Sequence, residues 1–93
     1  MELKCEIERH ADACQLDIRT ATIVIERVLI REPALEFDRD YQLEEIVGKA
    51  FWATYEHVGR RIGKFFARMV RHGCLPFRLS RIRSDRHRMY RRT

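Results

Sequence analysis

The stretch that decides the fold runs from Tyr41 to His72 and reads YQLEEIVGKAFWATYEHVGRRIGKFFARMVRH. Its apolar residues recur at steps of three and four, which is the spacing of an amphipathic helix. Acidic residues lie in the first turn and basic residues in the last, as the helix dipole favours, and Gly73 supplies a C-terminal stop. We therefore expect one long helix over residues 40–72, about 50 Å in length if unbroken.

Residues 1–32 contain two segments, 1–8 and 14–19, in which apolar and polar residues alternate. Period-two alternation is typical of a half-buried strand. Folding one segment onto the other pairs apolar residues with apolar residues and opposite charges with each other in the same register. Residues 22–31 are rich in β-branched side chains, which suits a third strand. We favour an antiparallel hairpin or meander here.

A helical interpretation of the same residues stays open. No Gly or Pro occurs before Pro33, and the proposed turn lacks the residues that a tight hairpin prefers. A helix would, however, stack Glu2 on Glu6 and Glu8 on Asp12, which places like charges one turn apart. The stripe that such a helix would present consists of Leu3, Ile7, Ala11, Cys14, Ile18, Ala21, Ile25 and Val28.

At 93 residues, of which 45% are apolar, the chain fits one domain (1–93) with a modest core. We predict an α+β fold, in which an N-terminal antiparallel β-hairpin or meander packs on one long amphipathic C-terminal helix. An Arg-rich extension over residues 77–93 follows. No apolar run approaches the roughly 20 residues of a membrane span, and the N-terminus lacks a secretory signal. Three cysteines, an odd count, favour a reducing compartment, so we expect a cytoplasmic protein without membrane contact.

Charge is divided unequally between the two parts of the chain. Residues 1–58 carry 13 acidic and 7 basic side chains, whereas residues 59–93 carry one acid, Asp85, against 12 bases. A surface this basic calls for an acidic counterpart, which is either a phosphate backbone, an acidic protein surface or the acidic half of the same chain.

The basic residues form two groups. Those of the helix recur at helical spacing on one ridge and are Arg60, Arg61, Lys64, Arg68 and Arg71. Those of the extension are Arg78, Arg81, Arg83, Arg86, Arg88, Arg91 and Arg92, with Tyr90 among them as a surface for base stacking. Both groups are predicted to contact a nucleic acid or an acidic partner. A solvated helix face, with a tail lying on the acidic half, is the alternative.

The segment from Arg71 to Pro76 resembles the helix-to-wing junction of excisionase-type winged helices. The wing that should follow lacks a Gly at its turn and is too short, so membership of that family is not predicted. Gly59 is preceded four positions earlier by Tyr55, which is too large for a helix-turn-helix. Gly59 and Gly63 either divide the long helix in two or let another helix approach closely, and we favour the interpretation as weak points.

No metal, cofactor or catalytic residue is predicted. His72 and Cys74 are close in sequence, but no Cys-x-x-Cys pair exists. The sequence also has no Gly-rich phosphate loop, no Ser elbow and no carboxylate pair with catalytic spacing. We expect a protein that is not an enzyme.

Aromatic residues give the helix a second role. Trp52 and Tyr55 lie off its main apolar stripe, where an interface would use them, so a homodimer through the long helix is plausible. The predicted function is a small nucleic-acid-binding or nucleic-acid-associated regulatory protein. The alternative is a protein-binding inhibitor or adaptor, of the kind that phages or mobile elements encode, which docks on a larger complex by charge complementarity.

Overall fold

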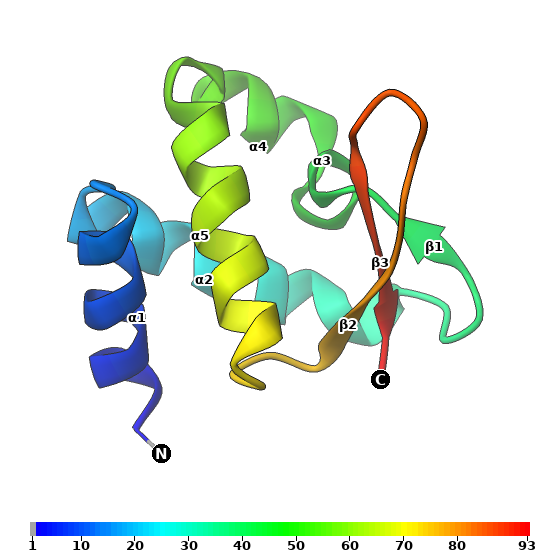
Figure 1. Ribbon diagram of the computed structural model, residues 1–93, viewed down its shortest axis with the longest axis horizontal. Coiled ribbons are helices and arrows are strands. Elements are labelled where there is room, and N and C mark those ends of the chain that lie inside the picture. Colours follow the sequence, from blue (N-terminus) through cyan, green and yellow to red (C-terminus); the bar gives the residue numbers. More distant parts are fainter. Residues whose placement is uncertain (1) are drawn as a thin grey trace.

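Helices make up most of the first 71 residues, and two of the three strands follow them (Figure 1). The computed structural model describes residues 2–93. The α-helices are α1 (Leu3–Ala13), α2 (Ile18–Arg31), α3 (Leu43–Val47), α4 (Lys49–Thr54) and α5 (Gly59–Arg71). Two 3-10 turns are η1 (Glu32–Ala34) and η2 (Glu56–Val58), and the strands are β1 (Asp40–Tyr41), β2 (Phe77–Ile82) and β3 (Arg88–Arg92).

The three strands form one antiparallel sheet in the order β1-β3-β2. Strand β3 lies in the centre, where Tyr90 pairs with Tyr41 on one side and with Leu79 on the other. The β2–β3 ladder shifts register between Leu79 and Arg81, which marks a bulge. The predicted Arg-rich extension over residues 77–93 is therefore a hairpin that belongs to the folded domain.

The core lies where α5 meets α1, α2 and the sheet. Phe65, Phe66 and Met69 of α5 are fully buried there. The Phe66 ring packs edge-on against Tyr90, with 4.7 Å between centroids, and so joins α5 to the central strand. Burial of each large apolar side chain contributes roughly 1.5–3 kcal/mol. Helix α5 is thus the element on which the other layers pack.

The predicted N-terminal hairpin was wrong, and the helical interpretation is nearer to the structure. The apolar stripe that begins at Leu3 is carried by two helices, which a turn at Gln15 (φ 54°) separates. Asp17 begins α2 by accepting a hydrogen bond from the backbone N–H of Thr20 at 3.1 Å, as an N-cap residue does. The like charges that argued against a helix are offset, because Glu6 pairs with Arg9 at 2.6 Å.

The single long helix predicted over residues 40–72 was also wrong, because the chain breaks twice within it. The first break is at Gly48, whose φ of 93° is unfavourable for residues with a Cβ. Two side chains of α2 satisfy the carbonyls left at the end of α3: Arg27 Nε donates to the oxygen of Val47 at 2.8 Å, and Arg31 Nε to that of Ile46 at 2.7 Å. The second break is η2, which turns the chain from α4 into α5.

Replacing Gly48 tests the first break. We expect Gly48→Ala to lower the free energy of unfolding by roughly 1–3 kcal/mol, because Ala must adopt a backbone conformation that is almost exclusive to Gly. A new Cβ would also lie 3.4 Å from the guanidinium of Arg27. Gly63→Ala is the matched control, since nothing lies within 4 Å of its Cβ position. That change should raise stability by about 0.5–1 kcal/mol in the same urea melts.

Candidate nucleic-acid interface

Helix α5 has one face in the core and one face in solvent. Arg60, Arg61, Lys64 and Arg71 are exposed on the outer face. Arg68 lies between the faces and is half-buried, because its Nε donates to Nδ1 of His10 in α1 at 3.3 Å. The predicted ridge of cations therefore exists over four exposed residues, and the fifth is held by a neighbouring helix.

The hairpin that follows α5 presents a second set of cations. Its turn is closed by two backbone hydrogen bonds, from Arg83 N–H to the carbonyl of His87 and from Arg86 N–H to the carbonyl of Arg83, both at 2.8 Å. Arg86 occupies the left-handed conformation (φ 70°) that a Gly would usually take. The segment after α5 therefore forms a hairpin although it has no Gly at its turn. The exposed arginines of the hairpin are Arg78, Arg81, Arg83, Arg86 and Arg88.

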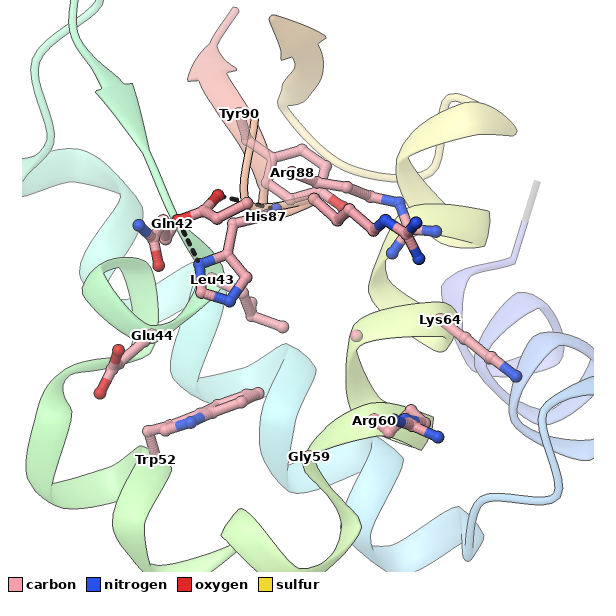
Figure 2. A pocket seen from close by; sticks show the side chains of 13 residues that line it. Gln42, Leu43, Glu44, Trp52, Gly59, Arg60, Lys64, His87, Arg88 and Tyr90 are labelled. Atoms are coloured by element: carbon pink, nitrogen blue, oxygen red, sulfur yellow. Dashed lines mark hydrogen bonds and ion pairs between the residues drawn. The ribbon is translucent and has the colours of Figure 1, made fainter. Parts of the chain in front are cut away.

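Two hollows that Arg60 and Lys64 line border α5. The larger, about 700 Å³, lies between α5, the start of α3 and the hairpin tip, and Figure 2 shows Arg60 and Lys64 on one wall with Arg88 reaching toward α5. The second, about 500 Å³, lies between α5 and residues 13–15, which follow α1. Arg60, Lys64 and Arg88 line both hollows. The cations of helix and hairpin thus form one continuous surface, which we call the α5–hairpin face.

The acidic half of the chain neutralises only part of this charge. Asp40, at the start of β1, accepts from Arg91 at 2.9 Å and pairs with Arg81 at 3.4 Å, while Glu32 pairs with Arg92. Arg83 pairs with Asp85 within the hairpin turn. Within residues 2–93, Asp and Glu form no ion pair with Arg60, Arg61, Lys64, Arg71, Arg78, Arg86 or Arg88. These seven side chains define the unneutralised cations of the α5–hairpin face.

The aromatic side chains predicted for binding lie elsewhere. Tyr90 is buried on the inner side of the sheet, and this burial raises the pKa of its hydroxyl to about 12. Its ring is therefore not presented for base stacking. Trp52 packs across Gly59, where a Cβ would lie 3.0 Å from the indole ring. Tyr55 packs on Phe51, with 5.0 Å between ring centroids. Trp52 and Tyr55 are both partly buried within the chain.

Gly63 is a further feature of the α5–hairpin face. It lies between Arg60 and Lys64 and lines the larger hollow. Its φ is ordinary and no side chain approaches it, so neither conformation nor packing calls for a glycine here. A glycine on an exposed helix face instead lets a ligand approach the backbone closely. In the sequence, the four-residue spacing that Gly59 and Gly63 share with Arg60 and Lys64 was the signal that could have indicated a glycine beside the cations of α5.

Comparisons with family models, with curated proteins and with solved structures each returned no match. Within residues 2–93, no helix has the length and apolar character that crossing a bilayer requires. The function of the chain has to be argued from the α5–hairpin face itself.

Asp40 provides a test of how the hairpin is held. The hydrogen bond from Ser80 is the largest effect that lowers the pKa of this carboxyl below its ordinary value of 3.8, followed by Arg91 and Arg81. A lowered pKa in the folded state means that the carboxylate stabilises the fold above pH 3.8 and that this stabilisation is lost as the pH falls through the lowered value. We expect Asp40→Asn to be less stable than the native protein at neutral pH.

The difference should shrink as urea melts are repeated at lower pH, because the native carboxyl also becomes neutral there. Asp38→Asn is the control, since Asp38 is exposed and has no ion pair in the described part of the chain. A difference between native protein and Asp40→Asn that stays constant down to acid pH would contradict the assignment.

Proposed function

We propose that this protein binds duplex nucleic acid, with DNA as the first candidate, through α5 and the β2–β3 hairpin. The observation that carries the proposal is the α5–hairpin face: seven cations from two consecutive elements lie on one surface without an intramolecular acid to neutralise them. Each phosphate that such a cation neutralises releases counterions, and this release contributes to affinity regardless of sequence.

The order of elements supports the same proposal. Helix α2, strand β1, helices α3–α4, helix α5 and strands β2 and β3 follow one another, and the sheet order is β1-β3-β2. This connectivity resembles that of winged helix-turn-helix domains, in which the second helix of the pair enters the major groove. Here that helix is α5, and the hairpin takes the place of the wing. The tight contact of Trp52 with Gly59 sets the approach of α4 to α5.

Shape also favours a duplex over a single strand. Helix α5 has 13 residues and is about 20 Å long, and the major groove of B-DNA, about 12 Å wide, admits a helix of this kind. Single-strand and RNA-recognition surfaces use exposed aromatic rings for stacking. In the sheet of this protein the two tyrosines, Tyr41 and Tyr90, are buried.

A protein-binding adaptor is the second candidate, and one observation favours it. Strand β2 is an edge strand, and two of its apolar side chains are exposed, Leu79 at 46% and Ile82 at 60%. An edge strand with apolar side chains can pair with a strand of another protein. The predictions that the chain is cytoplasmic, forms a homodimer and is not an enzyme stay predictions.

A salt titration tests the first candidate. We expect fluorescein-labelled duplex DNA of arbitrary sequence to bind the protein, with log K falling steeply between about 50 and 200 mM salt. In the double variant Arg60→Glu/Lys64→Glu the salt slope should become shallower by about 2, since roughly one counterion is released for each phosphate contact. Fluorescence anisotropy measures both quantities.

A matched variant distinguishes the contribution of the α5–hairpin face to DNA binding from the effect of net charge. Lys4→Glu/Lys49→Glu changes net charge by the same amount, but both lysines are exposed and neither lines the two hollows. Its salt slope should stay close to that of the native protein. An equal loss of DNA binding in both double variants, or no DNA binding at low salt, would exclude the proposal. If Arg60→Glu/Lys64→Glu still formed a complex with a protein partner, that result would point to the edge strand β2 as the binding surface.

Gly63→Ala gives a further test of close approach. Although this change should stabilise the isolated protein, we expect it to weaken DNA binding by several fold, because the new methyl group stands where the duplex would contact the α5 backbone. Anisotropy titration at one low salt concentration is sufficient. Unchanged or tighter binding would show that nothing approaches the helix at this position.

A further inference from the structure

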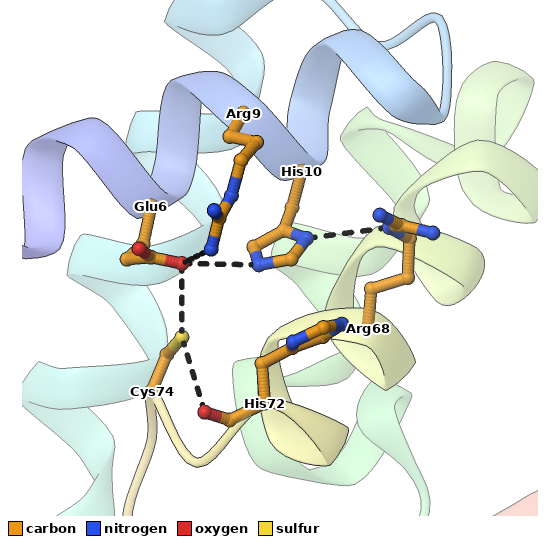
Figure 3. Close-up of polar contacts among 6 residues, drawn as sticks. All are labelled: Glu6, Arg9, His10, Arg68, His72 and Cys74. Atoms are coloured by element: carbon orange, nitrogen blue, oxygen red, sulfur yellow. Dashed lines mark hydrogen bonds and ion pairs between the residues drawn. The ribbon is translucent and has the colours of Figure 1, made fainter.

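A polar cluster joins α1 to the segment after α5 (Figure 3). Glu6 Oε2 lies 3.2 Å from Nε2 of His10 and 3.7 Å from Sγ of Cys74. The three ligand atoms of these residues all lie within 4.8 Å of one another. His10 is 1% exposed and is the only polar or charged residue that is buried within residues 2–93.

The two separations from Glu6 match those of a tetrahedral zinc site. With zinc bonds of about 2.0–2.2 Å to nitrogen or oxygen and about 2.3 Å to sulfur, neighbouring ligands of a tetrahedron lie about 3.3–3.4 Å apart for N and O and about 3.6 Å for S and O. We propose that Glu6, His10 and Cys74 form a binding site for a zinc ion, with the fourth position open to water.

The chemistry of the ligands agrees with the distances. A carboxylate, an imidazole and a thiol are the ligand types that zinc takes in proteins, and three protein ligands with one open position is a recurrent arrangement. Glu6 and His10 are four residues apart on α1, so one helical turn brings them to the same face. Burial, followed by the charges of His72 and Arg68, lowers the pKa of His10.

Loading the site requires two proton movements. The Cys74 thiol releases its proton to solvent when its sulfur binds zinc. Arg68 Nε–H can only donate, so Nδ1 of His10 accepts and Nε2 carries the ring proton. Zinc at Nε2 moves that proton to Nδ1, and Arg68 then loses its acceptor. The ring stays neutral throughout.

Cobalt and zinc titrations of the full chain test the site. One equivalent of Co²⁺ should produce a thiolate-to-cobalt charge-transfer band in the near ultraviolet, and Zn²⁺ should remove it by displacement. Isothermal titration with Zn²⁺ should give one ion per chain. These measurements use the native protein, so they do not depend on whether a variant folds.

Variants identify the ligands. Cys74→Ser and His10→Gln should each weaken zinc binding at least about tenfold, and Cys74→Ser should abolish the cobalt band. Cys5→Ser and His57→Gln are matched controls, because both residues are exposed and lie outside the cluster, and they should bind as the native protein does. Absence of the cobalt band in the native protein, or native affinity in Cys74→Ser with circular dichroism showing a folded chain, would overturn the proposal. None of these outcomes depends on nucleic-acid binding.

Discussion

The packing of Phe65 and Phe66 at the centre of α5 is the constraint on which the other elements depend. Both side chains are fully buried, and α1, α2 and the sheet all converge on the helix that carries them. Once this face is covered, the residues on the opposite side of α5 must point outward. Arg60, Lys64 and Arg71 are therefore exposed for the same reason that the phenylalanines are buried.

The unequal distribution of charge along the chain acquires two separate roles in the fold. Acidic residues from the first half of the chain hold the sheet, because Asp40 of β1 pairs with Arg91 and Arg81 while Glu32 pairs with Arg92. The seven unneutralised cations of the α5–hairpin face have no such partners within residues 2–93. Arginines that hold the sheet through ion pairs and arginines that are exposed to solvent are thus close together in the sequence but lie in different environments.

Sequence reasoning found the strongest signals and failed where a local contact decides. The amphipathic pattern that includes α5 and the outward ridge of cations are both visible in the spacing of residues. The break at Gly48 was not, since it depends on Arg27 and Arg31 reaching from α2 to the end of α3. The period-two pattern near the N-terminus also fits a helical stripe, and only the N-cap at Asp17 distinguishes the two.

The hairpin and the polar cluster of Glu6, His10 and Cys74 were not predicted from the sequence, and the reasons are related. Strands β2 and β3 are rich in arginine and lack a glycine at their turn, so composition alone suggested a tail. The apolar residues of these strands, among them Tyr90, can be assigned to the core only once the structure shows that Tyr90 packs on Phe66. Likewise Glu6 and Cys74 are 68 positions apart in the sequence. No motif of short spacing could therefore indicate that the end of α5 packs beside α1.

The length of β1 has a consequence for the motions of the protein. With only two residues, it is the one strand that attaches the hairpin to the segment between α2 and α3. A two-stranded ribbon is marginally stable in water, whereas helices packed on a buried centre are not. We therefore expect opening of the hairpin to be less costly than opening of the helical layer, so that amide protons of β2 exchange with solvent sooner than those in the middle of α5.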